Sequence, residues 1–344
     1  MQQGGDRRRA RLDDLARAAG VGIATVDRVV NDRGGVRPET VARIREAARR
    51  LGLAHRLPPE QHRRLRLVVV LQRRESWFYR TLSDAFGRTA ALLDPAISVY
   101  RSYVDELEPR ILAQRIAVEA AHCDGLAVVA MEAQEVLDAV AQVVARGVPV
   151  VTLLTDLPTS GRLAYVGVDN LRAGRTAGYL LGRLAGARQG PVLCLLGSRD
   201  YRGQRERVEG CAAVLGERFP RLGPVISVET GEESARTARL VGEQLQRQPG
   251  MVAVYNAAGA TEGMVEALAR ERRALVAVAH ELTPASREAL RSGLVDVVLD
   301  QNPNLQARRA LEILLHRHGR LGEPPGEPIV PLQIIVAESL AEAG

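Results

Sequence analysis

The chain has 344 residues, of which 46% are hydrophobic and 26% charged, a composition typical of a soluble globular protein. No apolar run approaches the roughly 20 residues that a bilayer span needs, so the sequence predicts no membrane segment. The formal net charge of +6 is unevenly spread, because residues 1–66 hold 16 basic and 8 acidic side chains while residues 67–344 hold 31 and 33. This asymmetry indicates either a polyanionic partner for the N-terminal part or a solvated basic surface there.

The N-terminus and the cysteines indicate the cellular compartment. The first residues, MQQGGDRRRARLDD, are polar and charged with no apolar segment behind them, so no secretory signal is expected. Cys123, Cys194 and Cys211 lie far apart among apolar or helical residues, which predicts buried free thiols instead of metal or redox chemistry. We therefore expect a cytoplasmic protein.

Three short helices are predicted at the N-terminus. The first has leucines and alanines at helical spacing and is stopped by Gly20. The second follows Gly22 and has an apolar face of isoleucine and valines. The third begins at Pro38, a favoured first helical residue, and ends at Gly52. Together they predict a small all-α domain over residues 1–55.

Residues 56–66, RLPPEQHRRLR, have no apolar period and are predicted to be a linker. Beyond it, continuous apolar strands alternate with amphipathic helices, which indicates parallel sheets covered on both faces. Ten strands are too many for one comfortable sheet, so two α/β lobes are expected in residues 67–344. The predicted strands are Leu67–Leu71, Ile97–Tyr103, Gly125–Ala130, Val148–Leu153, Tyr165–Val168, Val192–Leu196, Val225–Glu229, Met251–Val254, Leu275–Val278 and Val295–Leu299.

The sequence lacks the motifs of several enzyme classes. It contains no lysine, which excludes a P-loop, a Schiff base and a kinase-type lysine, and it has no GxSxG, HExxH or CxxC pattern. The glycine-rich NAAGATEG at residues 256–263 lacks the GxGxxG spacing, and the six histidines are scattered. We therefore expect no enzyme activity, no metal site and no cofactor.

The first two predicted helices have the pattern of a helix-turn-helix, whose second helix enters the major groove of DNA. Arg28 is suited to a bidentate contact with guanine, unless it is simply a solvated helix charge. Ile23 and Ala24 are suited to apolar contact with thymine methyl groups, and Thr25 to a phosphate. The predicted DNA-binding residues are Ile23, Ala24, Thr25, Arg28, Asn31 and Arg33.

The segment LARAAGVGIATVDRVVNDRGGVRPETVARIREAARRLG resembles the DNA-binding head of the lactose-repressor (LacI-type) family of bacterial transcription regulators. The lobes that follow resemble that family's effector core, which is similar to type I periplasmic binding proteins. The resemblance implies a helix-turn-helix head before a two-lobed α/β core, and a homodimer on a pseudo-palindromic operator. It also implies a small molecule in the cleft of the core that changes the affinity for DNA.

Four departures from this family lie in the head and linker. Arg11 and Gly22 stand where the family has Ser or Thr at the start of the first two helices, and Gly22 provides no hydroxyl for phosphate. Asp27 stands where Ser is expected and adds a negative charge beside the DNA. Pro58 and Pro59 disfavour the helix that the family's linker forms on the operator.

The linker also differs where the family inserts a leucine into the minor groove, because His62 lies near that position. Minor-groove bending is therefore in doubt. Arg63, Arg64 and Arg66 are instead expected to contact phosphates.

The effector is expected where the carboxyl ends of strands from two lobes face each other. Carboxylates, amides and arginines beside an aromatic face suit the vicinal hydroxyls of a sugar or polyol, although each residue alone could equally be a loop cap or a surface ion pair. The predicted effector-binding residues are Trp77, Phe78, Asp156, Arg205, Arg207, Asn256, Glu281 and Gln301. Resemblance to ribose-binding-type cores supports these positions, but Leu157 replaces the arginine that sugar binders usually have after the first aspartate.

These features predict a DNA-binding transcriptional repressor that a small sugar or polyol controls. The first lobe is expected to comprise residues 67–162 and 301–324 and the second lobe residues 163–300 and 325–344, with crossings near Leu163, Gln301 and Pro324–Pro328. Two alternatives are a solute-binding protein of a transporter and a sugar-modifying enzyme. The basic head and the missing signal disfavour the first, and the lack of a visible catalytic trio disfavours the second.

Overall fold

The computed structural model describes residues 12–31, 33–53, 57, 64–105, 108–271 and 273–340. The chain forms two compact units, residues 1–63 and residues 64–344. The expectations for Arg11, Pro58, Pro59, His62 and Arg63 lie outside the described residues. Within the described ranges, no helix has both the length and the apolar character needed to cross a bilayer.

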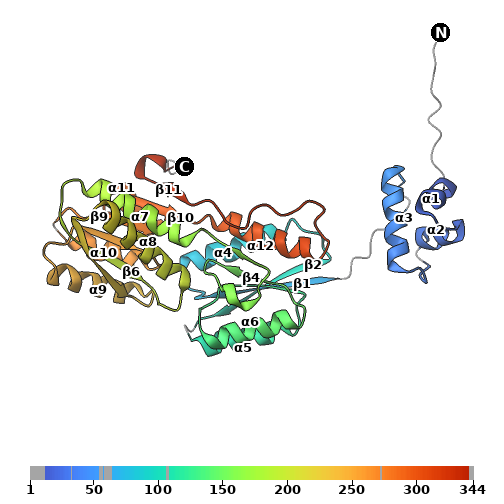
Figure 1. The fold of residues 1–344 in the computed structure, drawn as a ribbon, viewed down its shortest axis with the longest axis horizontal. Helices are drawn as coiled ribbons and strands as arrows, with labels where there is room; N and C mark the ends of the chain where they lie inside the picture. Colours follow the sequence, from blue (N-terminus) through green and yellow to red (C-terminus); the bar gives the residue numbers. More distant parts are fainter. Residues whose placement is uncertain are drawn as a thin grey trace, which may run out of the picture. The chain divides into compact units, whose positions relative to one another are not determined.

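The N-terminal unit, here called the head, is a bundle of short helices (Figure 1). They are α1 (Leu12–Ala19), α2 (Ile23–Val30) and α3 (Pro38–Arg50), which match the three predicted from the sequence. Leu15, Val26 and Ile44 are fully buried where the helices meet. Gly20 follows α1 with φ of +65°, a left-handed conformation that glycine adopts without strain and that ends the helix.

The first lobe of the core is a five-stranded parallel sheet with the order β2-β1-β3-β4-β5. Its strands are β1 (Leu65–Gln72), β2 (Ile97–Val104), β3 (Gly125–Val128), β4 (Val150–Leu153) and β5 (Ala164–Val166). Its helices are α4 (Trp77–Ala90), α5 (Pro109–Ala120), α6 (Gln134–Ala145), the short η2 (Pro158–Ser160) and α12 (Pro303–Arg317). α4 and α12 cover one face of the sheet, while α5 and α6 cover the other (Figure 1).

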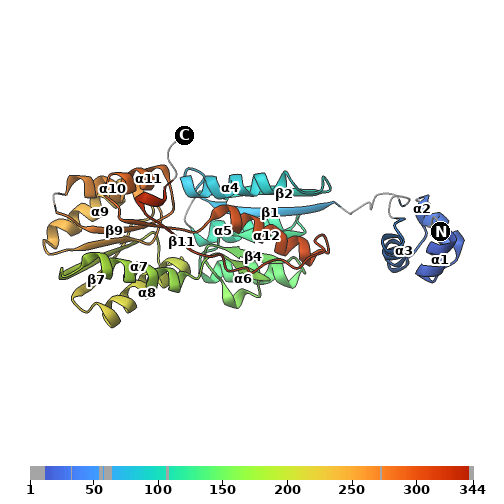
Figure 2. The same ribbon diagram turned by 90° about the horizontal axis from the view of Figure 1, so that it is seen from above.

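The second lobe is a six-stranded sheet with the order β11-β10-β9-β8-β6-β7. Its strands are β6 (Gly190–Leu196), β7 (Leu222–Glu229), β8 (Ala253–Asn256), β9 (Val276–His280), β10 (Val297–Asp300) and β11 (Gln333–Ile335). Its helices are α7 (Asn170–Ala185), α8 (Arg202–Arg218), α9 (Ser234–Arg247), α10 (Thr261–Arg270), α11 (Pro284–Arg291) and the short η3 (Ala337–Ser339). α7 and α8 pack on one face, and α9, α10 and α11 on the other (Figure 2).

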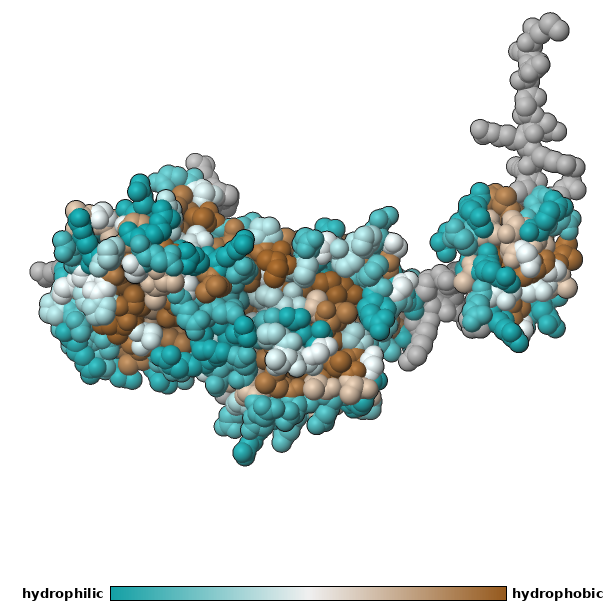
Figure 3. All heavy atoms as spheres, in the orientation of Figure 1, coloured by the Kyte–Doolittle hydropathy of each residue, from teal (hydrophilic) through white to brown (hydrophobic). Residues whose placement is uncertain are grey.

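Each of the ten predicted strands overlaps one of β1 to β10, so the two-lobed α/β core is confirmed. The strand β11 was not predicted, and it pairs antiparallel with β10 at the edge of the second sheet. On the face of the core drawn in Figure 3, hydrophobic side chains form separate patches among hydrophilic ones.

The chain crosses between the lobes three times. It leaves the first lobe after Val166, because β5 pairs with β4 in the first sheet. It returns at Gln301, between β10 and α12. It crosses last between Val330, which is buried in the core of the first lobe, and β11 of the second. The crossings were predicted near Leu163, Gln301 and Pro324–Pro328.

Candidate functional site

The head presents an exposed face of α2. Val26 and Val29 are buried against the other helices, so the residues between them and before them point outward. Ile23, which is 51% exposed, Ala24 and Arg28 lie on this outer side, and Thr25 is half-buried at its margin. An exposed isoleucine beside an exposed arginine suits the mixture of methyl groups and acceptors in the major groove.

Two of the predicted DNA-binding residues, which follow α2 in the chain, donate hydrogen bonds to the carboxylate of Asp27 in that helix. Asn31 Nδ2 donates to Asp27 Oδ1 over 2.7 Å, and Arg33 Nη1 donates to Asp27 Oδ2 over 3.0 Å. The negative charge of Asp27 is therefore partly balanced within the head, and the guanidinium of Arg33 is held back to α2. Gly22, at the N-cap of α2, supplies no side-chain cap.

The arginines at the start of the core differ in their surroundings. Arg64 is exposed immediately before β1. The guanidinium of Arg66 lies 4.3 Å from the centre of the Tyr100 ring, and the Arg66 amide donates to Asp124. Arg66 is thus anchored on the first lobe.

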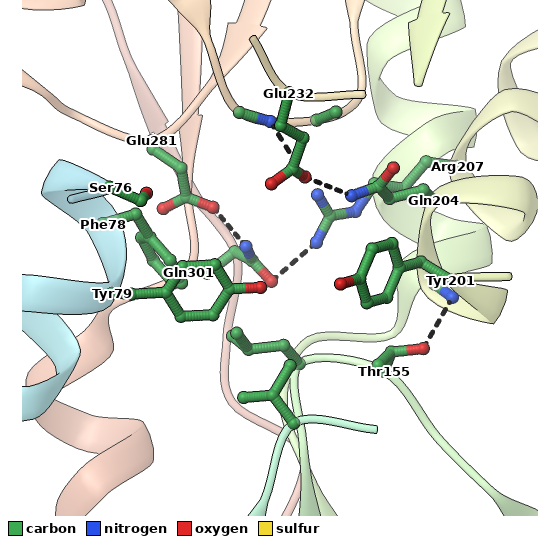
Figure 4. A pocket seen from close by; sticks show the side chains of 15 residues that line it. Ser76, Phe78, Tyr79, Thr155, Tyr201, Gln204, Arg207, Glu232, Glu281 and Gln301 are labelled. Carbon is green, nitrogen blue, oxygen red and sulfur yellow. Dashed lines mark hydrogen bonds between the residues drawn. The ribbon is translucent and has the colours of Figure 1, made fainter. Parts of the chain in front are cut away.

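A small cavity of about 60 Å³ lies between the two lobes of the core (Figure 4). We call it the inner cavity. It is lined by Ser76, Phe78, Tyr79, Val129, Leu154, Thr155, Tyr201, Gly203, Gln204, Arg207, Glu232, Ala258, Gly259, Glu281 and Gln301. These residues come after the carboxyl ends of strands in both sheets, where doubly wound folds bind ligands.

Arg207 is the central cation of the inner cavity and is only 5% exposed. Its Nε donates to Asn170 Oδ1 over 2.7 Å, Nη1 to the Ala257 carbonyl oxygen over 3.0 Å, and Nη2 to Gln301 Oε1 over 2.7 Å. All three acceptors are neutral. The guanidinium is thereby fixed in orientation without a hydrogen-bonded carboxylate.

Glu281 extends this network, because Gln301 Nε2 donates to its Oε1 (Figure 4). Its other oxygen, Oε2, is buried and has no hydrogen-bond partner among the described residues. Burial, and secondarily the negative charge of Asp300, raises the pKa of Glu281 to about 8. The backbone at Glu281 has φ of +69°, and its carbonyl oxygen accepts a hydrogen bond from Ser286 Oγ over 2.7 Å. A buried, unsatisfied carboxylate oxygen in a cavity is a position where a ligand can donate a hydrogen bond.

Glu232 brings a second carboxylate into the inner cavity from the loop after β7. Gln204 Nε2 donates to Glu232 Oε1 over 2.7 Å, and the Gly259 amide lies 3.5 Å from the same oxygen. Glu232 also has a left-handed backbone, with φ of +55°. Arg73 of the first lobe donates to the carbonyl oxygens of Gly231 and Glu232, so the loop is tied across the cavity mouth.

Aromatic side chains form another wall of the inner cavity. The rings of Phe78 and Tyr79 meet edge to face, with centroids 5.7 Å apart. Tyr79 and Tyr201 come from opposite lobes and their hydroxyl groups point toward each other (Figure 4). The Tyr201 hydroxyl donates to Gln72 Oε1, which links the lobes again. Burial raises the pKa of both tyrosines, so both remain protonated donors.

Four of the predicted effector-binding residues line the inner cavity: Phe78, Arg207, Glu281 and Gln301. Trp77 lines an adjoining outer cavity. Asp156, Arg205 and Asn256 line neither of these cavities.

The three residues outside the cavities have structural partners of their own. Asp156 forms an ion pair with Arg162, 2.5 Å between Oδ2 and Nη2, and accepts from the Leu157 amide. Arg205 forms an ion pair with Glu132. Asn256 Nδ2 donates to the Gly259 carbonyl oxygen over 3.0 Å and shapes the loop after β8. These residues follow strands that end near the cavities, but their side chains form hydrogen bonds within loops or ion pairs elsewhere and do not line either cavity.

Several side chains that line the inner cavity were not predicted from the sequence, and only some of them had a sequence signal that could have indicated them. Glu232 lies shortly after a predicted strand, in ETGEES, so the strand-end argument could have found it. Gln204 lies in the same loop-to-helix segment as Arg207. Tyr79 and Tyr201 carried no comparable signal, because an aromatic at the start of a helix is most often a core residue. Among the described residues, no group of acidic, histidine or cysteine side chains could hold a metal ion.

Comparison with known families identifies both parts of the chain. Residues 110–318 match the model of the periplasmic binding protein domain, and residues 11–54 match that of bacterial regulatory proteins of the lacI family. No curated protein matches the chain.

Solved structures share the fold of the core. A solute-binding protein of an ABC transporter from Burkholderia graminis C4D1M, in complex with D-arabinose, is 19% identical with a TM-score of 0.74, over 82% of this chain and 99% of that chain. A glucose-galactose binding protein from Geobacillus stearothermophilus is 20% identical with a TM-score of 0.73, over 80% and 98%. A periplasmic solute-binding protein from Actinobacillus succinogenes 130z with bound D-allose is 18% identical with a TM-score of 0.70, over 80% and 98%. The chain belongs to the periplasmic binding protein domain family and carries, at its N-terminus, the DNA-binding domain of the lacI family of bacterial regulatory proteins.

Proposed function

We propose that this protein is a transcriptional repressor whose affinity for operator DNA is controlled by a small sugar or polyol bound between the lobes of its core. The observation that carries the proposal is the inner cavity, in which the buried Arg207, Gln301 and Glu281 form one hydrogen-bonded network, in a chain whose N-terminus matches the lacI family of regulatory proteins. The ligand is bound and released unchanged, without an enzymatic step.

The chemistry of the cavity supports a ligand rich in hydroxyl groups. A guanidinium has five N–H donors, and three of those of Arg207 are used within the protein, so two remain for ligand oxygens. Glu281 Oε2 can accept from a hydroxyl, and Phe78 and Tyr79 offer an apolar wall to the C–H face of a ring. The names of the similar structures support the same class, because those proteins bind D-arabinose, glucose or galactose, and D-allose.

The proposed DNA contacts come from the outer side of α2. Arg28 would contact a guanine, and Ile23 and Ala24 would contact thymine methyl groups. Thr25 would contact a phosphate, and Asn31 and Arg33 would contact the DNA backbone. A homodimer would place two such helices on the half-sites of a pseudo-palindrome. The operator, and hence the site of action, is in the cytoplasm.

Control of DNA binding would follow from the position of the ligand between two lobes. A ligand that touches both lobes favours the closed arrangement over an open one, by the difference in its affinity for the two. In a dimer, closure would change the separation of the two heads and thus the affinity for an operator with fixed spacing.

Operator selection tests this proposal. The full-length protein is incubated with a pool of random duplexes, alone and with each of a panel of pentoses, hexoses and polyols. We expect a palindromic motif whose recovery changes with one class of compound. Enrichment that no compound alters would overturn effector control, and no enrichment under any condition would overturn the DNA-binding function.

A further inference from the structure

The inner cavity opens into a second, larger space, which we call the outer cavity. The outer cavity has a volume of about 660 Å³. It shares five lining residues with the inner cavity: Ser76, Phe78, Glu232, Gly259 and Glu281. A ligand held by Arg207 would therefore lie next to Glu232 and Glu281, which also line the outer cavity together with Trp77.

The walls of the two cavities carry an excess of negative charge. Their carboxylates are Glu75, Asp105, Glu232, Glu233, Glu262 and Glu281. Their guanidinium groups are those of Arg73, Arg80 and Arg207. This local balance is opposite in sign to the formal net charge of +6 of the whole chain.

Among the residues that line the inner cavity, the acidic side chains outnumber the basic ones. Arg207 faces the two carboxylates of Glu232 and Glu281. Glu232 is held by the amide groups of Gln204 and Gly259, which are neutral donors. Glu281 is 6% exposed, and its Oε2 has no partner among the described residues. If both glutamates were ionised, Arg207 would be the one cation among the residues that line the inner cavity. Glu281, the more deeply buried of the two, has an unsatisfied oxygen, and its pKa of about 8 keeps it protonated at neutral pH until a cation lies beside it.

We propose that the effector is a cationic amino sugar or amino polyol whose ammonium group binds between Glu281 and Glu232 while its hydroxyl groups contact Arg207 and Gln301. This inference rests on the proposed function and specifies the class of ligand. An ammonium group supplies N–H donors to Glu281 Oε2 and to Glu232, and it balances the second carboxylate of the inner cavity.

The outer cavity favours the same ligand. Its carboxylates attract a cation toward the mouth and repel sugar phosphates and sugar acids. Trp77 adds an aromatic face, which attracts ammonium groups through its quadrupole. The pKa of Glu281, raised to about 8 by burial, is consistent with a carboxyl group that lacks a compensating cation until the ligand arrives.

Calorimetric titration of the full-length protein with matched ligands tests the inference. Each sugar is used in three forms: the neutral hydroxyl sugar, the 2-amino-2-deoxy sugar and its N-acetyl derivative, with 1-amino-1-deoxy alditols beside the parent alditols. We expect at least one amine to bind tenfold or more tightly than both neutral counterparts. We also expect this preference to decrease as salt is raised, because added ions screen charges at the cavity mouth.

Two variants locate the ammonium group. In Glu281→Gln and, separately, Glu232→Gln, the ratio of amine affinity to neutral-sugar affinity should fall to about twofold or less, because each variant removes one of the two carboxylates that bind the ammonium group. Glu288→Gln is the matched control, because this glutamate lies on α11 of the same lobe with its side chain 75% exposed and outside both cavities. It should keep the full preference. Either variant suffices if the other does not fold.

The outcomes separate this inference from the proposed function. Equal or tighter binding of the neutral forms overturns the cationic ligand and leaves a sugar-responsive regulator in place. A preference for the amine that survives both Glu281→Gln and Glu232→Gln overturns the assigned position. If no sugar, polyol or amine binds, the proposed function itself fails.

Discussion

At the scale of single residues, Arg28 is the side chain on which operator recognition should depend most. It is exposed on the outer side of α2, where a bidentate contact with guanine is geometrically accessible. We expect Arg28→Ala to weaken binding to the selected operator by about 1–3 kcal/mol. The measurement is fluorescence anisotropy with the selected duplex and with a scrambled one. An equal loss on both duplexes would assign Arg28 to the phosphates instead of a base.

Asp27 should tune the electrostatic part of DNA binding. Its carboxylate holds Arg33 and Asn31, so replacing it removes a negative charge and frees a guanidinium. We expect Asp27→Asn to raise the affinity for any duplex and to make its salt dependence steeper. One additional phosphate contact corresponds to a slope change of about 0.9 in a plot of log affinity against log salt. An unchanged slope would contradict the expectation and show that Asp27 does not limit the contact of Arg33 with the DNA.

Glu281 should make the stability of the core depend on pH. The folded pKa of about 8 lies above the ordinary value of 4.5, so the folded state keeps a proton that the unfolded state has lost in between. The free energy of unfolding therefore falls as pH rises from 4.5 to 8, by about 1.4 kcal/mol per unit of pKa difference in the limit. Asp300 and Glu232 add to the shift, whereas Arg207 and Gln301 oppose it.

Urea unfolding of the full-length protein between pH 5 and 8 checks this expectation, with the single tryptophan, Trp77, as the fluorescent probe. We expect the decline to be smaller in Glu281→Gln than in the wild type, because an amide has no proton to lose. The free energy of unfolding of Glu288→Gln should decrease with pH as it does in the wild type. Parallel curves for all three proteins would contradict the raised pKa.

Which site residues could be predicted depended on what the backbone alone determines. The strand-end rule found Glu281 and Gln301, because β9 and β10 end at the cavity and the next residue must lie there. It also selected Asn256 and Asp156, whose side chains turn instead to Gly259 and Arg162. The direction of a side chain in a loop depends on partners that are distant in sequence, and a single sequence does not reveal them.

At the scale of elements, the packing of α7 on α8 positions Arg207. A Cβ atom at Gly174 of α7 would lie 1.9 Å from the backbone oxygen of Arg207, and one at Gly210 of α8 would lie 2.2 Å from that of Leu171. The two backbones thus touch at the glycines. Any larger residue there must separate α7 and α8 and thereby displace Arg207.

We expect Gly174→Ala to destabilise the core by about 3 kcal/mol, the upper part of the range for overpacking, because backbone atoms cannot rotate away. Its affinity for the effector should also fall. Gly216→Ala is the control on α8, since a Cβ atom there would meet nothing within 4 Å and alanine favours a helix. Thermal unfolding and effector titration of both variants provide the test. Equal behaviour would show that the helix contact is adaptable.

The elements themselves were largely predictable because their apolar periods are long and regular. The exception, β11, has only three residues, and two of them are exposed, so neither alternation nor an apolar run marks it. It is held by pairing with β10, which is a long-range contact. The exact end of the first lobe is equally hard to predict, because β5 is short and its sheet is determined by pairing with β4.

At the scale of the whole molecule, Arg73 should control how firmly the lobes close on a ligand. Its guanidinium crosses from the first lobe to two carbonyl oxygens of the loop at Glu232. Hydrogen bonds of a charged group contribute about 1.5–3 kcal/mol, so we expect Arg73→Ala to bind the effector about tenfold more weakly, mainly through faster dissociation.

Stopped-flow dissociation, followed through Trp77 fluorescence, measures this effect. Arg74→Ala is the matched control, because the Arg74 guanidinium lies 4.6 Å from the Tyr103 ring centre within the first lobe. It should dissociate at the wild-type rate. If both variants dissociate equally fast, the loop at residues 73–74 has a local role and does not bridge the lobes.

The repeated crossing of the chain between the two lobes has a consequence for how the protein folds during its synthesis on the ribosome. The hydrophobic core of the first lobe includes Leu311 and Leu314 of α12, which follow the whole β6–β10 part of the second lobe in the sequence. The head, whose core lies entirely within residues 12–57, can fold when little else has been made. We therefore expect each nascent chain to pass through a stage with a folded head and a first-lobe sheet face that α4 covers only in part, which exposes apolar surface to chaperones until α12 has been synthesised.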